Sequence, residues 1–210
     1  MPRVTFFNLP EDKKQKLISA AKKEFSRVPL FDALISNIVK SAEIPRGSFY
    51  QYFEDKEDAF FFILNDLVVK NNSEFVRLLK KYEGDIFDTL IEFYQFIIEE
   101  DENFHFFKNI FLNMTYQIDH TFSKTFSDRD SKEHFKRISS LININTMNVS
   151  NDKELSHVMQ IITAVTLRNF VEKYAKNLTI EEAVNNYKIE IHLLKKGLSK
   201  PASNEGELSQ

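Results

Sequence analysis

The chain has 210 residues, no cysteine and no tryptophan, and its 28 basic and 31 acidic side chains give a formal net charge of −3. This length suffices for one domain of ordinary size plus a small appended one. The missing cysteines exclude a disulfide scaffold, a thiolate nucleophile and a Cys-ligated metal site. No apolar run approaches the roughly 18 residues of a membrane span, and the first residues lack the apolar core of a signal peptide. We therefore expect a cytoplasmic protein with no membrane partner.

The rarity of helix breakers predicts the fold class. Between Ser48 and Lys196 the only glycine or proline is Gly84. A β-sheet needs frequent turn residues, and parallel α/β units usually carry glycine at their strand–helix turns. The sequence therefore predicts an all-α protein.

Four helices are predicted in the N-terminal part of the chain. Pro10 suits the start of the first helix, and Pro29 ends it. Asp55 is a suitable N-cap for a long fourth helix. The predicted helices cover 10–28, 33–41, 45–52 and 56–82.

The C-terminal part is predicted to be helical throughout. Two capping-box patterns, Asn151 with Glu154 and Thr179 with Glu182, open the last two long helices, and two lysines followed by Gly197 close the chain's final helix. Residues 199–210 are polar and are expected to form a disordered tail. The other helices predicted after Gly84 cover 85–100, 103–114, 116–126 and 131–144.

The second and third helices describe a helix-turn-helix, a unit whose second helix lies in the major groove of DNA. The tight connection Ala42-Glu43-Ile44 joins them. An arginine can form two hydrogen bonds with a guanine edge, and tyrosine and serine hydroxyls suit phosphate oxygens. The apolar spacing predicts a shared core of Ile38, Ala42, Ile44, Phe49 and Phe53, which leaves Arg46, Ser48, Tyr50 and Gln51 on the other faces.

Charge divides the chain in the same way. Residues 1–53 carry a net charge of +4 and the remainder −7. A basic N-terminal module on an acidic body indicates that the front end meets a polyanion, although a solvated helix face gives the same pattern.

The segment 38–58, IVKSAEIPRGSFYQYFEDKED, resembles the helix-turn-helix of the TetR family of transcriptional regulators. The resemblance covers about the first 60 residues. It implies that Tyr52 and Lys56 contact phosphates and that Ser36 lies near the DNA backbone. The complete set of expected DNA-binding residues is Ser36, Pro45, Arg46, Gly47, Ser48, Tyr50, Gln51, Tyr52 and Lys56.

Two positions depart from the family pattern. Glu43 stands where the turn commonly has glycine, so a left-handed backbone there costs about 1 kcal/mol and brings a negative charge toward DNA unless the side chain points away. Leu34 replaces a Ser or Thr at the start of the second helix, and we expect Asp32 to cap that helix instead.

Phenylalanine dominates the body of the chain, with 14 of the 21 phenylalanines between Phe60 and Phe135. Such residues form cores first of all, but apolar pockets lined by aromatics also hold apolar ligands, and the resemblance implies an effector cavity here. The expected effector is a flat or hydrophobic molecule such as a fatty acyl chain, an aromatic drug or a porphyrin. On ligand chemistry alone, His105, His120 or Tyr116 could bind haem iron. The candidate ligand-binding residues are Phe62, Phe93, Phe104, His105, Phe107, Phe111, Tyr116 and His120.

These features predict a ligand-responsive transcription factor, a repressor rather than an enzyme, that needs no bound metal or other cofactor. We expect a helix-turn-helix DNA-binding domain over 1–54, a helical effector-binding and dimerisation domain over 55–198, and a homodimer formed through residues about 152–197 on a palindromic DNA operator. Effector binding would shift the long fourth helix and change the spacing of the recognition helices. The alternative is a helical binder of haem or lipid whose N-terminal module mediates protein contacts.

Overall fold

A computed structural model describes residues 2–100, 103–113, 118 and 138–199. Within these ranges the regular structure is helical, apart from one isolated β-bridge between Met147 and Ser199. The predicted all-α fold class is confirmed. In chain order the helices are α1 (Val4–Phe7), α2 (Glu11–Arg27), η1 (Leu30–Asp32), α3 (Ile35–Ala42), α4 (Arg46–Tyr52), α5 (Lys56–Lys81), α6 (Ile86–Glu99), α7 (Phe104–Leu112), η4 (Ile144–Thr146), α10 (Asp152–Ala175) and α11 (Ile180–Leu198).

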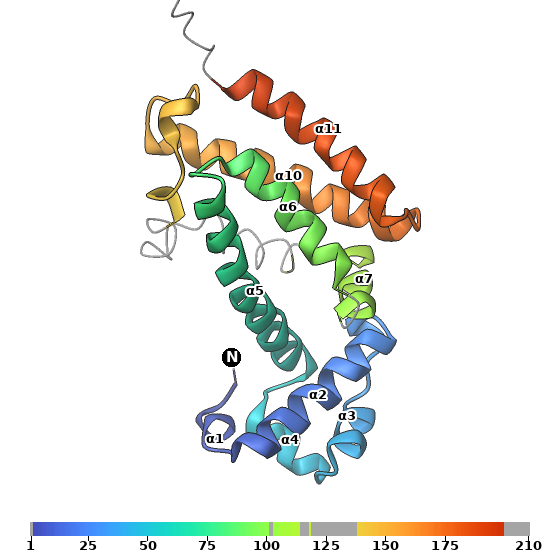
Figure 1. Cartoon of the computed structure of the whole chain (residues 1–210). Helices are drawn as coiled ribbons and strands as arrows, with labels where there is room; N and C mark the ends of the chain where they lie inside the picture. Colours follow the sequence, from blue (N-terminus) through green and yellow to red (C-terminus); the bar gives the residue numbers. More distant parts are fainter. Residues whose placement is uncertain (1, 101–102, 114–117, 119–137, 200–210) are drawn as a thin grey trace, which may run out of the picture.

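The helices form a small N-terminal group and a larger body (Figure 1). Helices α1 to α4 lie at one end of the molecule, and α10 and α11 pack together at the other. The long helix α5 leads from the first group into the body, where it packs against α6. Helix α7 contacts both α2 and α10, so it forms a second connection between the two groups.

Side-chain caps fix the starts of the long helices, as the sequence predicts. Asp55 accepts a hydrogen bond from the Asp58 N–H, and Thr179 forms a complete capping box with Glu182. Asn151 accepts from the Glu154 N–H at 3.0 Å, but the Glu154 carboxylate bonds the N–H of Ser150 rather than that of the N-cap. Each cap satisfies backbone donors that have no partner inside the helix.

Three predicted helix limits were wrong. Asp32 does not cap α3: it belongs to the 3-10 helix η1, and the N-cap position is Leu34. Gly197 lies inside α11, which continues to Leu198, because the last turn continues through the glycine without strain. The predicted helix over 131–144 does not reach its expected end, where the chain forms turns and then η4.

The sequence analysis also missed α1, a four-residue helix with buried Phe6. Its single apolar turn is too short to give a periodic signal. Residues 116–126 of another predicted helix and the tail after Ser199 lie almost entirely outside the described residues.

An aromatic cluster joins the N-terminal helices to the body. The ring of Phe60 on α5 lies 5.3 Å from that of Phe25 on α2 and 5.7 Å from that of Phe106 on α7. All three side chains are buried. Aromatic pairs at such distances add about 0.5–1.5 kcal/mol each beyond the area that they bury, so the two groups of helices share one continuous core.

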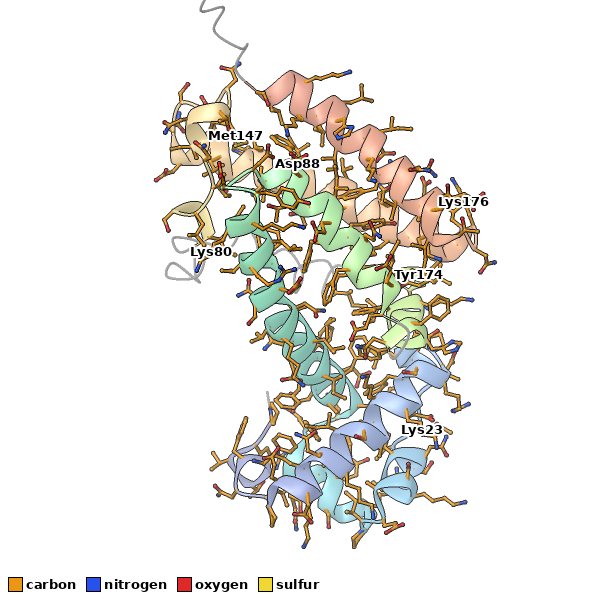
Figure 2. The ribbon with its side chains drawn as sticks, viewed as in Figure 1. Lys23, Lys80, Asp88, Met147, Tyr174 and Lys176 are labelled. Atoms are coloured by element: carbon orange, nitrogen blue, oxygen red, sulfur yellow. The ribbon has the colours of Figure 1, made fainter. Side chains whose placement is uncertain are left out.

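At the far end of the body, an ion-pair cluster and a glycine turn hold the helix ends together. The Lys195 Nζ on α11 lies 2.7 Å from Asp85 Oδ2 and 2.9 Å from Asp88 Oδ2. Figure 2 labels Asp88, in the first turn of α6. Gly84, with φ +85°, connects α5 to α6, and a Cβ there would lie 2.5 Å from the carbonyl oxygen of Leu141. Only glycine fits this close approach without displacing backbone.

Candidate nucleic-acid interface and effector cavity

The helix-turn-helix is built as predicted around a small apolar core. Ile38 of α3 and Phe49 of α4 are fully buried, and Phe53 after α4 is buried beside them. Ile44 of the turn is half-buried and packs against the same core. The turn residue Glu43 adopts the left-handed conformation, with φ 55° and ψ 42°, and ends α3.

The carboxylate of Glu43 forms an ion pair with the Lys16 ammonium on α2. This hydrogen bond lowers the pKa of the carboxyl. The Glu43 carboxylate is therefore paired within the protein. The positive charge of Lys16 offsets its negative charge close to α4.

A buried carboxylate, that of Glu24 on α2, caps α3 in place of a residue from α3's own sequence. Its Oε1 accepts hydrogen bonds from the Leu34 N–H at 2.9 Å and from the Asn37 side chain at 3.0 Å. The Arg27 guanidinium donates to both carboxylate oxygens, at 2.7 and 2.9 Å. These bonds, the one from Arg27 first, lower the pKa of Glu24 to about 2.

The predicted DNA-contacting residues lie on or beside α3 and α4, at the end of the molecule farthest from α11 (Figure 1). A Cβ built on Gly47 meets nothing within 4 Å, so the packing of this chain does not require glycine there. Exposed members are Ser36, Pro45, Arg46, Gly47, Tyr50 and Gln51, whereas Ser48, Tyr52 and Lys56 are half-buried.

Lys56 is held inside the domain. Its Nζ donates to the carbonyl oxygens of Phe31 at 2.7 Å and Ala33 at 3.2 Å. The ammonium therefore fastens the start of α5 to η1. For Lys56 to contact a phosphate, as expected from the sequence, its ammonium must bond the phosphate in addition to these carbonyl oxygens or in place of one of them.

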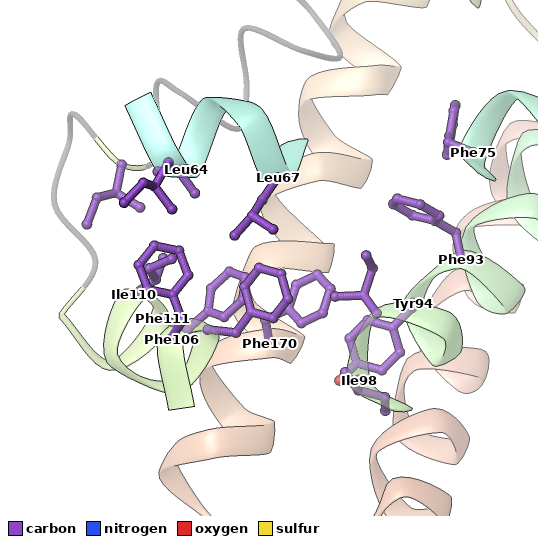
Figure 3. Packing of buried hydrophobic residues seen from close by; sticks show 14 of the residues in the cluster. Leu64, Leu67, Phe75, Phe93, Tyr94, Ile98, Phe106, Ile110, Phe111 and Phe170 are labelled. Atoms are coloured by element: carbon purple, nitrogen blue, oxygen red, sulfur yellow. The ribbon is translucent and has the colours of Figure 1, made fainter. Parts of the chain in front are cut away.

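An apolar cavity of about 70 Å³ lies between α5, α6, α7 and α10. The rings of Phe111 and Phe170 stack beside it, 4.6 Å apart and 7° from parallel (Figure 3). The hydroxyls of Thr163 and Thr166 donate to carbonyls of their own helix at 2.8 Å, which leaves their methyl groups as apolar lining. Further lining residues are Val68, Asn71, Leu90, Phe93, Ile97, Phe107, Met159, Ile162 and Leu167.

The expected ligand-binding residues fall into four groups. Phe93, Phe107 and Phe111 line the cavity. Phe62 packs instead against Phe6 of the N-terminal group, at 5.0 Å between ring centroids. Tyr116 and His120 lie outside the described residues. Of the remaining two, Phe104 packs against Tyr174 at 5.5 Å and His105 is exposed, so neither reaches the cavity.

The described residues contain no group of three or more His, Asp or Glu side chains placed to hold a metal ion. In that same part of the chain, no helix is long and apolar enough to cross a membrane.

An exposed recognition helix in a helix-turn-helix, joined by a long helix to a larger helical body, defines the class of helix-turn-helix regulators. Residues 17–61 match the family model for bacterial regulatory proteins of the tetR family. Residues 85–198, more than half of the chain, match the model for the tetracyclin repressor-like C-terminal domain. The chain therefore belongs to the TetR family of transcriptional regulators.

Individual relatives are distant. The HTH-type transcriptional regulator HbdR of Aromatoleum sp. is 34% identical over 77 residues, which is 37% of this chain and 34% of that protein. The match thus spans about a third of the relative's length. The structure of SmeT, the repressor of a Stenotrophomonas maltophilia multidrug efflux pump, aligns with a TM-score of 0.65 at 14% identity over 90% of this chain and 91% of that chain. The structure of FadR from Bacillus subtilis in complex with stearoyl-CoA aligns with a TM-score of 0.59 at 15% identity, over 87% of this chain and 98% of that chain.

The Glu24 cap predicts a pH-dependent stability. The pKa of this carboxyl is lower in the folded chain than its usual value of 4.5, so its contribution is present above pH 4.5 and is lost as the pH falls toward 2. At pH 7 we expect Glu24→Gln to lower the free energy of unfolding by about 2 kcal/mol, because it removes the charged acceptor of four hydrogen bonds.

Urea unfolding at several pH values measures this effect. The gap between the native protein and Glu24→Gln should narrow steadily below pH 4.5. The matched control is Glu57→Gln, which removes an exposed carboxylate on α5. A gap that stays constant from pH 7 to pH 3 would contradict the role of the charged cap.

Proposed function

We propose that this protein is a ligand-responsive transcriptional regulator, a repressor that binds a palindromic operator as a homodimer in the cytoplasm. The observation that carries the proposal is the recognition helix α4. Buried Phe49 holds it in place, while Arg46, Tyr50 and Gln51 face solvent. Gly47 supports the same interpretation. A glycine inside a helix costs about 1 kcal/mol of stability relative to alanine, and here its open side allows another backbone, such as that of DNA, to approach closely.

Exposed aliphatic side chains on α10 and α11 support the homodimer. Ile189 is 61% and Leu193 62% exposed, and their spacing of four places both on one face of α11. Ile161 on α10 is 49% exposed. An aliphatic stripe of this kind is stabilised by burial against a second copy, and a two-fold dimer presents two recognition helices to the same face of DNA. Their expected separation is about 34–36 Å or a multiple of it.

The cavity supports an apolar effector. Its volume, about 70 Å³, is small compared with the roughly 150 Å³ of a cavity that holds benzene. An effector of drug size therefore binds only if the surrounding helices move apart. Because FadR is an acyl-CoA complex, we include acyl chains beside flat aromatic molecules among the candidate effectors. A ligand that binds the expanded state better shifts the protein toward that state.

Two of the four cavity helices reach the N-terminal group. Helix α5 continues into it, and α7 contacts α2. The Asn109 side chain on α7 donates to the carbonyl oxygens of Phe25 at 2.9 Å and Ser26 at 3.0 Å, in the last turn of α2. Phe107 and Phe111 of the same short helix line the cavity. We assign effector coupling to both routes, whereas the sequence analysis considered α5 alone.

DNA recognition is tested by two substitutions with different expected effects. Arg46→Ala should reduce the preference for DNA from upstream of the protein's own gene over random duplex by about tenfold or more, because it removes a base-edge contact. Tyr52→Phe should weaken binding to both duplexes alike, since it removes a phosphate contact. Fluorescence anisotropy measures both affinities. If neither substitution changes binding, α4 does not read the groove, and the alternative of a small-molecule binder becomes the better interpretation.

The dimer is tested by Leu193→Glu, which places a charge in the proposed interface. We expect a monomer in sedimentation equilibrium at micromolar concentration, because an unpaired buried charge costs several kcal/mol. Val69→Glu is the matched control, since Val69 is 60% exposed on α5, away from the stripe. A dimer that survives Leu193→Glu but not Val69→Glu would assign the interface to another face.

The α7 route is tested by Asn109→Ala once native mass spectrometry has selected an effector from a panel of fatty acids, acyl-CoAs and flat aromatic molecules. We expect the effector to bind with unchanged affinity but to alter DNA affinity about fivefold less than in the native protein. Asn113→Ala is the control, because among the described residues its side chain bonds the Asn109 carbonyl of the same segment and no group of the N-terminal helices. An undiminished response in Asn109→Ala would leave α5 as the only route.

A further inference from the structure

The segment that precedes α2 is packed onto the recognition helix. Helix α1 lies beside α4 at the end of the molecule that carries the helix-turn-helix (Figure 1). Phe6 is only 1% exposed, and its ring lies 5.0 Å from those of both Phe53 and Phe62. A single aromatic side chain therefore anchors these few residues to the core that positions α4.

This segment also satisfies the free end of the recognition helix. The Arg3 N–H donates to the Tyr52 carbonyl oxygen at 2.8 Å, and the Thr5 hydroxyl donates to the Gln51 carbonyl oxygen. The last carbonyls of a helix have no partner within it, so these two bonds act as a C-terminal cap supplied by another segment. Because Arg3 caps with its backbone, its side chain takes no part in the cap.

The guanidinium of Arg3 is available for an outside partner. The side chain is exposed, and among the described residues no carboxylate lies within ion-pair distance of it. Two other cations of this group are paired internally, Lys16 with Glu43 and Arg27 with Glu24. Arg3 instead combines an exposed guanidinium with a backbone that is fixed by its hydrogen bond to Tyr52.

Arg3 and Arg46 lie at opposite ends of α4. The helix has seven residues, so its axis is about 10 Å long, close to the roughly 12 Å width of the major groove. A helix of this length with its first turn at the base edges has its last turn near one wall of the groove. That wall is the phosphate backbone, and Tyr52, the neighbour of Arg3, is the residue expected to contact it.

We propose that Arg3 is a further DNA-contacting residue, which binds a backbone phosphate beside Tyr52 while the segment Arg3–Phe7 fixes the end of the recognition helix. The inference rests on the proposed function. Arginine suits the role because its fork of donors matches phosphate oxygens. Such a contact adds affinity and no sequence preference.

The test compares Arg3→Ala, Arg3→Lys and the native protein, each with any purification tag at the C-terminus. Fluorescence anisotropy is measured over a salt series on DNA from upstream of the protein's own gene and on random duplex. Arg3→Ala should bind both about tenfold more weakly. The slope of log affinity against log salt should become shallower by about 1.8, two lost phosphate contacts per dimer. Arg3→Lys should retain the native slope.

Lys23→Ala is the matched control for the loss of one positive charge. Lys23 is exposed near the end of α2 that faces the body, away from α1 and α4 (Figure 2). If Lys23→Ala changes the slope as much as Arg3→Ala, overall charge explains the effect and the proposal is overturned. It is also overturned if Arg3→Ala binds DNA as the native protein does. If the native protein itself binds neither duplex, the proposed function fails first. Unchanged thermal unfolding of Arg3→Ala confirms that the backbone cap is retained.

Discussion

The arrangement of the DNA-binding end depends on one buried carboxylate. Glu24 reaches from the last turns of α2 to the N–H of Leu34, the N-cap residue of α3, and α3 in turn fixes α4 through their shared core. The adjacent Phe25 and Ser26 offer their carbonyl oxygens to Asn109 of α7. Three consecutive residues of α2 therefore hold the helix-turn-helix on one side and the helical body on the other. In the proposed regulator, this turn couples the two.

The small size of the cavity determines how much the surrounding helices must move when a ligand enters. Stacked Phe111 and Phe170 close much of the space between α7 and α10, and aromatic side chains have few rotamers in which to make room. A well-packed core has discrete arrangements rather than a continuous range of them. Under the proposed function, binding energy from an effector is spent on separating helices, of which α5 continues into the DNA-binding group and α7 contacts α2. In this proposal the packing that stabilises the body is also what an effector must rearrange.

Much of this organisation is readable in the sequence, and the failures have physical reasons. Caps such as Asp55 and Thr179 are local signals, and the family-like segment around Tyr50 is nearly contiguous, so the long helices and the recognition helix were predicted correctly. Capping acceptors that are distant in sequence, as Glu24 is from α3, leave no local pattern. The sequence also cannot show which of its many phenylalanines face the same cavity. Phe62 packs against Phe6 of the N-terminal group, whereas its neighbours on α5 contact other helices.

The left-handed turn places a strained residue with a carboxylate, Glu43, shortly before the proposed recognition helix. A glycine there would relieve about 1 kcal/mol of backbone strain, release the Lys16 ammonium and remove one negative charge beside the recognition helix. Stability and attraction to DNA would rise together. In the regulator proposed here, a single substitution at this turn would therefore exchange readily reversible DNA binding for tighter binding.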